Sequence, residues 1–491
     1  MDYLAFDLGA GSGKLFRGRF DGETLGLTTI HRFQNGPVPL GDGLYWDFLY
    51  IWNNLRTGIQ KAARQGPLRS VGVDSYCNDF SFIDGTGDLL SPMRSYRDPR
   101  TIRCAEAIYR TMSPRELYWE TGNQIAPFNT LMQLAAMRAE KKDAVLETAR
   151  RLLFLPDLLA FYMTGEELAE RSLSSVSQMF RFDTGTWSER ILEAYRIPKR
   201  LFGALTDPGT VSGRTAPRFC RELAIDPMDF VSVCEHDTAS AFLARPSGGD
   251  GAILSSGTWS LVGCESAGPV INDYGFQYNI ANEGSFPGHH RLLCNVMGSW
   301  LLQELRADYA REGRDYSFAQ LEALARESKV AGALIDTDDP QFFSPGEMRL
   351  KLRALCRSSD GVKPESPGEF ARCVYDSLAL KYRWAVERLE TLTGRSFPVV
   401  HVIGGGSRDA LSCQLCADVC GRPVLAGPEE ASALGNLLAQ LLAYGEIGDI
   451  AQGRELISNS FPPTRYEPKD TARWDEIYGK YRATFDPAGA D

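Results

Sequence analysis

Two turns of small residues, each flanked by short apolar runs, recur in the two halves of this chain. The first occupies residues 7–14 after the apolar run 3–6, and the second occupies 255–258 after 252–254. Asp21-Gly22 is a strong two-residue hairpin signal, so residues 3–30 are predicted to form three strands joined by two tight turns. A stretch rich in Pro, Ser and Gly at 246–251 separates the halves. The repeated pattern predicts two related α/β halves.

Periodic apolar residues predict helices over 103–118, 130–150, 296–311 and 367–392. The run 399–403 predicts a buried strand, which Gly404-Gly405-Gly406 follows directly. A glycine turn between a strand and a helix lets a flat ligand such as adenine or ribose lie against bare backbone. Such turns also occur without any ligand, so both interpretations stay open.

Composition narrows the functional classes. At roughly 150 residues per domain, the 491 residues predict about three domains, or two large ones. The hydrophobic fraction of 43% is enough for packed cores. The net charge of −10 argues against nucleic-acid binding, which needs a basic face. The chain has no run of about 18 apolar residues, so we expect no membrane partner.

Two further features bear on the compartment. Residues 1–3 do not form a basic leader, and the 11 cysteines are an odd, scattered number that is typical of a reducing compartment. We expect a cytoplasmic protein. The charge pattern leaves its oligomeric state open between monomer and dimer.

The first turn, Asp7-Leu8-Gly9-Ala10-Gly11-Ser12-Gly13-Lys14, has several interpretations. A Walker phosphate loop needs four residues before Gly-Lys-Ser/Thr, whereas three residues separate Gly9 from Gly13 and Leu15 follows Lys14. A dinucleotide loop needs a helix directly after it, whereas a strand is predicted here. What remains is a hairpin whose N–H groups face phosphate oxygens, with Asp7 holding Mg²⁺ through water, or a purely structural hairpin.

The second turn, Ser255-Ser256-Gly257-Thr258, offers hydroxyl and N–H groups at the matching position of the second half. Two such turns facing each other across a cleft would hold a triphosphate from both sides. The alternative is again an ordinary hairpin.

The segment 235–241 places titratable groups at the start of a helix of small residues. Asp237 lies where a carboxylate is favoured as a helix cap. The same carboxylate is also suited to act as a general base that takes a hydroxyl proton during phosphoryl transfer. By contrast, Cys413, Cys416 and Cys420 have helical spacing and no second pair of ligands, which favours buried thiols over a zinc site.

The chain carries, in this order, the segments Asp7-Leu8-Gly9-Ala10-x-Ser12-Gly13, Gly72-Val73-Asp74-Ser75, Tyr96-Arg97-Asp98-Pro99-Arg100, His236-Asp237-Thr238-Ala239-Ser240, Ser255-Ser256-Gly257-Thr258-Trp259-Ser260, Asn282-Glu283-Gly284, Asn295-Val296-Met297-Gly298, Gly404-Gly405-Gly406-Ser407 and Ala426-Gly427-Pro428-Glu429-Glu430-Ala431. This series resembles the FGGY carbohydrate kinases and, within them, the rhamnulokinase branch. The resemblance covers residues 3–445.

The resemblance implies an α/β fold in which two ribonuclease-H-like domains, of the actin and hexokinase type, flank a central cleft. It implies a sugar-binding domain at 1–245, an ATP-binding domain at 246–445 and a tail at 446–491 that packs on the second domain. Members of the family phosphorylate a sugar hydroxyl with ATP and Mg²⁺. In the rhamnulokinase branch the reaction converts the ketose L-rhamnulose to L-rhamnulose 1-phosphate.

Carried over residue by residue, the resemblance makes Asp237 the catalytic base, and Asp7 is the expected metal position. The expected sugar-binding positions are Cys77, Asn78, His236, Asp237, Thr238 and Asn295. The expected nucleotide-binding positions are Ala10, Gly11, Ser12, Gly13, Lys14, Thr258, Gln303 and Gly405.

The chain departs from the family pattern in two places. Gly11 and Lys14 replace the usual serine and arginine of the phosphate turn, and lysine keeps the charge without the forked donors of arginine. The branch's Asp-Ser-Trp-Gly-x-Asp reads Asp74-Ser75-Tyr76-Cys77-Asn78-Asp79 here. Cys77 adds a side chain where backbone would meet the sugar, and sites that read hydroxyls discriminate strongly. The substrate therefore stays open between L-rhamnulose, L-fuculose and a pentulose.

The alternative of another class is an actin-like ATP-binding module without catalysis, because a fold does not fix a function. Trp46, Tyr96 and Arg97, near the expected sugar side, favour a small-molecule kinase instead.

Overall fold

A computed structural model describes residues 2–329, 331–358, 361 and 363–486. The chain forms two compact units, each assembled from separate segments. The first contains Met1–Ser247, Glu265–Leu292 and Glu430–Ser460, and the second contains Gly248–Cys264, Leu293–Glu429 and Phe461–Asp491. The predicted domain boundaries at 245/246 and 445/446 stay predictions.

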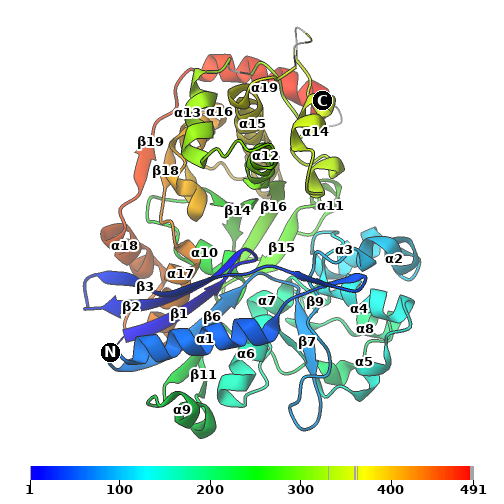
Figure 1. The fold of residues 1–491 in the computed structure, drawn as a ribbon, viewed down its shortest axis with the longest axis vertical. Coiled ribbons are helices and arrows are strands. Elements are labelled where there is room, and N and C mark those ends of the chain that lie inside the picture. Colours follow the sequence, from blue (N-terminus) through cyan, green and yellow to red (C-terminus); the bar gives the residue numbers. More distant parts are fainter. Residues whose placement is uncertain (1, 330, 359–360, 362, 487–491) are drawn as a thin grey trace. The chain divides into compact units, whose positions relative to one another are not determined.

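The first unit is built on a six-stranded mixed sheet (Figure 1). Its strands, in spatial order, are β11 (Thr210–Arg214), β12 (Asp229–Ser232), β6 (Leu68–Ser75), β1 (Asp2–Leu8), β2 (Ser12–Phe20) and β3 (Leu25–Gln34). Strands β12, β6 and β1 are parallel neighbours, while β1, β2 and β3 form antiparallel hairpins. The predicted strand, turn, strand, hairpin and strand at the N-terminus are confirmed.

Alternation along β1 and β6 decides which side chains face which layer. Leu4 and Phe6 of β1 pack with Val71 and Val73 of β6 in one apolar core, together with helices α1 (Phe48–Ala63) and α6 (Leu155–Thr164). Because successive side chains point to opposite faces of a sheet, Asp7 faces the other layer. Helix α17 (Ala431–Ala443) packs there on β1 and β6 (Figure 1).

Helices α17 and α10 (Asp237–Leu243) pack closely against each other. Gly435 of α17 allows this approach, because a Cβ at that position would collide with the carbonyl oxygen of Ser240 in α10. The remaining helices of the first unit are α2 (Arg100–Tyr109), α3 (Pro114–Thr121), α4 (Thr130–Ala139), α5 (Ala144–Thr148), α7 (Arg171–Ser175), α8 (Glu189–Ala194), α9 (Pro217–Leu223), α11 (Asp273–Gln277) and α18 (Ile450–Ser460). Its small two-stranded sheets are β4 (Val38–Leu40) with β5 (Gly43–Tyr45), β7 (Phe80–Ile83) with β8 (Arg151–Phe154), and β9 (Phe180–Arg181) with β10 (Thr186–Trp187).

The helix predicted over 103–118 is wrong as a single element. It is two helices, α2 and α3, because Ser113 caps α3 with a complete capping box and Pro114 occupies its first turn. The helix predicted over 130–150 is likewise divided into α4 and α5. At 296–311 the helix α12 (Trp300–Arg311) begins four residues later than predicted, because the strand before it continues to Met297.

A seven-stranded sheet contains the second small-residue turn. Its strands, in spatial order, are β15 (Ala281–Gly284), β16 (His290–Met297), β14 (Trp259–Ser266), β13 (Ala252–Ser256), β17 (Val400–Ile403), β18 (Val424–Ala426) and β19 (Thr464–Tyr466). The helices of the second unit are α12, α13 (Phe318–Glu327), α14 (Met348–Leu355), α15 (Pro367–Thr393), α16 (Ala410–Cys420) and α19 (Thr471–Phe485). As in the first half, a hairpin, β13–β14, is followed in the sheet by a parallel neighbour, here β17.

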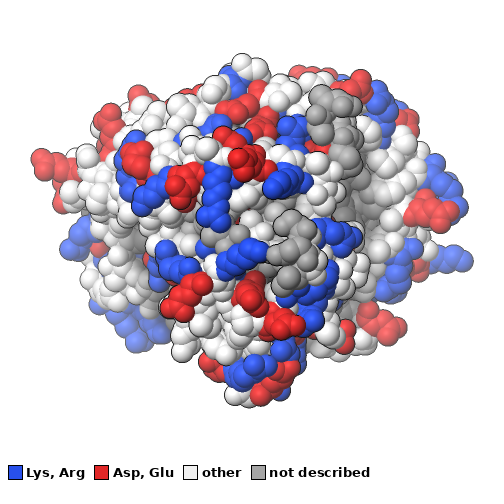
Figure 2. All heavy atoms as spheres, turned by 90° about the horizontal axis from the view of Figure 1, so that it is seen from above, with Lys and Arg blue, Asp and Glu red and all other residues white. Residues whose placement is uncertain are grey.

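On the face shown in Figure 2, acidic and basic side chains are interspersed among the described residues. Within the part of the chain that the structure describes, every helix is too short or too polar to cross a membrane. The thiols of Cys413, Cys416 and Cys420 are buried along α16.

Candidate active site

Three carboxylates of the first unit gather where neighbouring parallel strands end. Asp7 near the end of β1 is in register with Asp74 near the end of β6. Ser75, the last residue of β6, forms a parallel β-bridge with His236, and its N–H donates to the Glu235 carbonyl oxygen at 2.9 Å. Asp237, the next residue after His236, therefore lies at the same edge of the sheet. Ligands of open α/β sheets bind outside the carboxyl ends of parallel strands. The sheet therefore brings Asp7 and Asp237, which the sequence singled out, to one place in the first unit.

Few donors neutralise these carboxylates. Asn436 of α17 donates to Asp74 Oδ2 at 2.7 Å, whereas Asp74 Oδ1 is buried and has no hydrogen-bond partner in the described part of the chain. Burial and the charge of Asp237 raise the pKa of Asp7 to about 7. Burial and the charge of Asp7 raise the pKa of Asp74 well above its ordinary value. Because a bound cation would favour the charged form of these carboxyl groups, the cluster is suited to hold one.

The first small-residue turn lies beside this cluster. Lys14 on β2 is in register with Asp7, and its ammonium contacts both carboxylate oxygens of Glu430 at 2.7 Å. Both side chains remain about one-quarter or less exposed, at 21% and 24%. At the tip of the turn Gly11 is exposed, and a Cβ there would meet no atom within 4 Å. The turn thus presents open backbone beside a cation that is already paired.

Asp237 is the first residue of α10, and His236 is the residue that caps this helix. The Oδ1 atom of Asp237 accepts from Thr238 N at 2.6 Å and from Thr238 Oγ1 at 3.1 Å. No donor faces Oδ2 among the described residues, and the side chain is 29% exposed. Burial raises the pKa of Asp237, and the charge of His236 opposes this. A fixed carboxylate with one open oxygen and a raised pKa has the properties of a general base.

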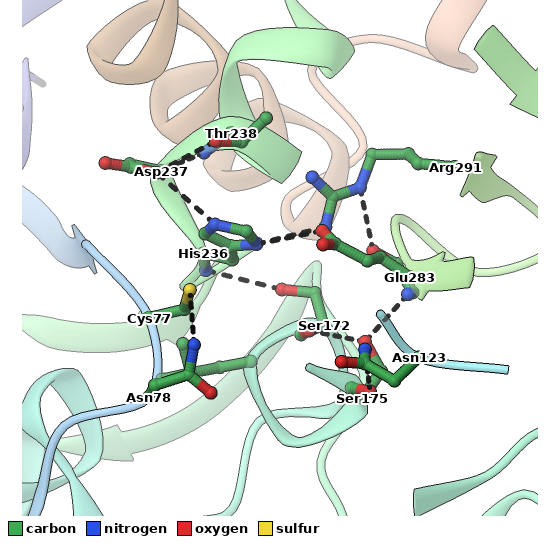
Figure 3. A network of polar contacts seen from close by, with 12 residues as sticks. Cys77, Asn78, Asn123, Ser172, Ser175, His236, Asp237, Thr238, Glu283 and Arg291 are labelled. Carbon is green, nitrogen blue, oxygen red and sulfur yellow. Dashed lines mark hydrogen bonds and ion pairs between the residues drawn. The ribbon is translucent and has the colours of Figure 1, made fainter. Parts of the chain in front are cut away.

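His236 is held by a buried ion pair (Figure 3). Its Nδ1 lies 3.3 Å from Glu283 Oε2, and Arg291 Nη2 lies 2.9 Å from the same oxygen. Arg291 is fully buried and also donates from Nε to the Gly284 carbonyl oxygen at 3.0 Å. Burial lowers the pKa of His236, but Cys77 and Glu283 outweigh this and raise it. The imidazole therefore presents Nε2 toward Asp237, at 3.6 Å from its Oδ1.

Three further carboxyl groups lie buried behind this loop, on Asp157, Glu170 and Glu235. Glu170 accepts from the N–H groups of Ser172 and Leu173 at 2.7 and 2.8 Å and from Glu235 N at 3.3 Å. Burial and the negative charges of Asp157 and Glu170 raise the pKa of Glu235 well above its ordinary value. Burial also raises the pKa of Asp157 to about 8 and that of Glu170 to about 7. The raised pKa values favour shared protons among these three groups, and the hydrogen bond from Glu235 N to Glu170 fixes the backbone just before His236.

The segment that departs from the family pattern lies next to His236 in Figure 3. Cys77 is half-buried, and Asn78 Nδ2 donates to its Sγ at 3.1 Å. Asn78 is buried with φ +74°, a conformation that asparagine tolerates, and its Oδ1 accepts from Thr130 N at 3.2 Å. Both ends of the Asn78 amide are therefore engaged inside the protein. Of these two residues, Cys77 is the one with side-chain surface left to contact a ligand.

An aromatic cluster adjoins Cys77. The rings of Trp46 and Tyr76 are 4.5 Å apart, and Tyr96 lies 6.1 Å from Tyr76 and 6.2 Å from Phe128. Trp46 Nε1 donates to Asp79 Oδ2 at 2.5 Å. Flat apolar faces with a few polar groups are typical of small-molecule sites.

The expected nucleotide-binding residues of the second half gather within the second unit. Gln303 Nε2 donates to Thr258 Oγ1 at 3.4 Å and to Ser299 Oγ at 3.0 Å. The glycine turn after β17 lies against the second small-residue turn, since a Cβ at Gly406 would collide with Ser256 Oγ. By contrast, a Cβ at Gly405 would meet no atom within 4 Å. Bare backbone at Gly405 thus faces open space.

Two models of the FGGY family of carbohydrate kinases match the chain, the N-terminal domain over residues 3–244 and the C-terminal domain over 252–444. The chain belongs to this family. This FGGY kinase is 37% identical over 479 residues to a rhamnulokinase of Bacteroides thetaiotaomicron, covering 97% of this chain and 98% of the relative. It is 38% identical over 470 residues to a rhamnulokinase of Enterococcus faecalis, covering 95% and 94%.

Solved structures confirm the fold of this FGGY kinase. A ligand-bound xylulose kinase from Lactobacillus acidophilus superposes with a TM-score of 0.82 at 15% identity, covering 98% of each chain. Glycerol kinase from Plasmodium falciparum gives 0.79 at 14% identity, covering 99% of this chain and 98% of the other. The predicted α/β fold of the sugar-kinase type is confirmed, and the alternative of a non-catalytic actin-like module has no support from these comparisons.

The structure of this FGGY kinase also shows contacts between its own residues that sequence reasoning missed. Glu430 lies in one of the quoted segments, but nothing local predicts its contact with Lys14, and no pattern predicts that Asn436 reaches Asp74. Glu283 stands in a recognised motif, but its partner Arg291 follows eight residues later with no signal of its own. Asn295, an expected sugar-binding residue, lies on β16 in the second unit, and its role stays a prediction.

Proposed function

We propose that this carbohydrate kinase transfers the γ-phosphoryl group of ATP to the 1-hydroxyl of L-rhamnulose, giving L-rhamnulose 1-phosphate and ADP. Curated relatives that share 37–38% of its residues across nearly their whole length carry the name rhamnulokinase. The observation that carries the proposal is the carboxylate of Asp237, fixed through Oδ1 and open at Oδ2, beside the His236–Glu283–Arg291 chain.

In the proposed reaction the hydroxyl oxygen forms a bond to the γ-phosphorus while the bond between that phosphorus and the β,γ-bridging oxygen breaks. Asp237 orients the hydroxyl and accepts its proton at Oδ2. Phosphoryl transfer has a loose transition state, so positioning and charge stabilisation supply most of the rate enhancement. The rigid His236–Glu283–Arg291 chain serves this need, because its buried charges keep the loop before Asp237 in one conformation.

Ala10, Gly11, Ser12 and Gly13 are proposed to donate backbone N–H groups to phosphate oxygens, because their turn is open at its tip. Lys14 would exchange its contact with Glu430 for a phosphate oxygen when nucleotide binds. Thr258, Gln303 and Gly405 are proposed to contact the nucleotide, with Gly405 offering backbone that no side chain covers.

The Asp7 cluster fits Mg²⁺. Among the described residues, the three carboxylates do not converge closely enough to form a complete metal site by themselves. Mg²⁺ is usually held by one or two carboxylates, with water and substrate phosphates as its other ligands. Asp7, with Asp74 beside it, supplies carboxylate charge that few donors neutralise. When bound, Mg²⁺ neutralises charge on the β- and γ-phosphates.

Sugar selection is proposed to rest on Cys77, His236, Thr238 and Asn295, with the aromatic cluster as a wall. Asn78 is proposed to act by holding the Cys77 thiol in place, because its own amide is engaged with Thr130. Cys77 occupies the position where relatives of this branch are expected to bring bare glycine backbone, which keeps L-fuculose and a pentulose as alternative substrates.

The test is ADP release measured with L-rhamnulose, L-fuculose and D-xylulose at equal concentrations and saturating MgATP. The proposal predicts the highest kcat/KM for L-rhamnulose. A higher value for either other ketose would replace the substrate but keep the kinase, and ADP release independent of every sugar would overturn the proposal.

The odd number of cysteines, all 11 with free thiols, suits action in the cytoplasm.

A further inference from the structure

A cavity of about 260 Å³ lies in the first unit, outside the kinase site. Strand β7 contributes the rings of Phe80 and Phe82 to its lining, and helix α4 contributes Met137. Arg94 and Arg100 are the two arginines that line it. None of the residues assigned above to the kinase reaction lines this cavity. Its size, just below the usual range for ligand pockets, suits a small metabolite.

Arg100 is the unusual member of this lining, because it is only 3% exposed and incompletely paired. Its Nη2 donates to Gln133 Oε1 at 3.0 Å, while its Nε has no hydrogen-bond partner in the described part of the chain. Burial and the nearby charge of Arg94 lower the pKa of Arg100 to about 10. A buried cation with an unused donor is costly unless an anion completes it.

The acids around the cavity offset this charge only in part, and the charges of Asp98, Asp79 and Glu140 all act on Arg100. Arg94 forms an ion pair with the buried carboxylate of Asp98 at 3.5 Å. Glu140, the acidic residue of the lining, is shared between Lys142 at 3.3 Å and Arg103 at 3.5 Å. Among the lining residues, Arg94, Arg100 and Lys142 outnumber Glu140, so the lining itself carries a net positive charge between apolar walls.

We propose that this cavity binds a small phosphate monoester, whose phosphate contacts Arg94 and Arg100 and whose carbon skeleton lies against Phe80, Phe82 and Met137. The planar guanidinium of arginine matches phosphate oxygens with two parallel donors. An apolar surface beside the guanidinium groups gives an ester an advantage over free phosphate.

Gln133 connects this cavity to the kinase site. Its Oε1 accepts from Arg100, while its Nε2 donates to the Asn78 carbonyl oxygen and to Asp79 Oδ1, each at 3.1 Å. A phosphate that takes donors from Arg100 competes with Gln133 for them. Binding then loosens the contacts of Gln133 with Asn78 and Asp79, and Asn78 in turn holds the Cys77 thiol. An occupied cavity therefore changes the KM for the ketose. This last step rests on the proposed function, whereas binding itself does not.

The test is isothermal titration calorimetry at constant ionic strength with glycerol 3-phosphate and D-glucose 6-phosphate, neither of which is a ketose product. Arg100→Met and Arg94→Met remove one cation each and keep apolar volume. Arg110→Met is the matched control, because Arg110 directly follows α2 but is exposed and does not line the cavity. Circular dichroism verifies that each variant is folded, and Arg94→Met keeps the test valid if Arg100→Met is not.

We expect saturable binding of an ester by the wild type and by Arg110→Met. In Arg94→Met, and in Arg100→Met where it folds, the affinity should fall about tenfold to a hundredfold, the range for a lost charged hydrogen bond. Failure of the wild type to bind either ester would overturn the proposal. So would unchanged binding in the folded cavity variants, since the ester would then occupy the phosphate turn of the kinase site. Neither result bears on ADP release with ketoses, so the two proposals fail separately.

Discussion

Replacing Asp237 with asparagine removes one negative charge while leaving the shape of the side chain unchanged. The asparagine Oδ1 can still accept from Thr238 N, now at 2.6 Å, so α10 keeps its start. The group placed at the open position becomes an amide nitrogen, which cannot accept a proton. Loss of a general base costs about 10²- to 10⁴-fold in turnover, which corresponds to roughly 2.7–5.4 kcal/mol of transition-state stabilisation.

The assay is coupled ADP release with L-rhamnulose, together with nucleotide binding measured separately. We expect Asp237→Asn to lower kcat within that range while the affinity for ATP stays close to that of the wild type. Asp226→Asn is the control, because Asp226 is exposed and removes the same charge from the same unit. Turnover of Asp237→Asn near that of the wild type would refute the assignment and leave Asp237 with a structural role at the helix start.

Three other substitutions test separate parts of the account. Cys77→Gly should raise the kcat/KM ratio of L-rhamnulose over L-fuculose by about tenfold, since a small change of side chain in a pocket alters discrimination by 10–200-fold; an unchanged ratio would show that the thiol does not contact the sugar. Gly405→Ala should leave the Tm unchanged, because its Cβ meets no atom within 4 Å, but raise the KM for ATP about tenfold or more by intruding on the nucleotide; an unchanged KM would contradict the contact. The raised pKa values of Asp157, at about 8, and Glu170, at about 7, mean that these acids contribute stability that is complete below their ordinary pKa near 4 and is lost as pH rises through 7 to 8. The pKa of Glu235 is raised in the same direction, so Glu235→Gln should remove its share of the loss of Tm between about pH 6 and pH 9. An equally steep loss in the variant would show that Glu235 takes no part.

Local patterns in the sequence predict the hairpins well, because the physical causes of a hairpin lie within a few residues. Asp21-Gly22 favours a tight turn by itself, and the small-residue turns lie between apolar runs of strand length. The segment around Asp237 was also identifiable, since its titratable groups precede a helix of small residues.

What local patterns do not predict are contacts between distant segments. Lys14 meets Glu430 across 416 positions, and Asn436 reaches Asp74 across 362, because residues 430–460 return to the first unit. The same limitation hid Arg291, whose role depends on a histidine 55 positions earlier. Asn78 shows the converse case, since its amide is suited to bind a sugar but is engaged by Thr130 inside the fold.

The most direct test of the central claim is a ³¹P NMR time course with equimolar ATP and L-rhamnulose in the presence of Mg²⁺. If the γ-phosphoryl group is transferred to the 1-hydroxyl, the γ-phosphate signal is replaced by one phosphate monoester on C1, in step with ADP. Release of inorganic phosphate without an ester, or an ester at another carbon, would contradict the claim.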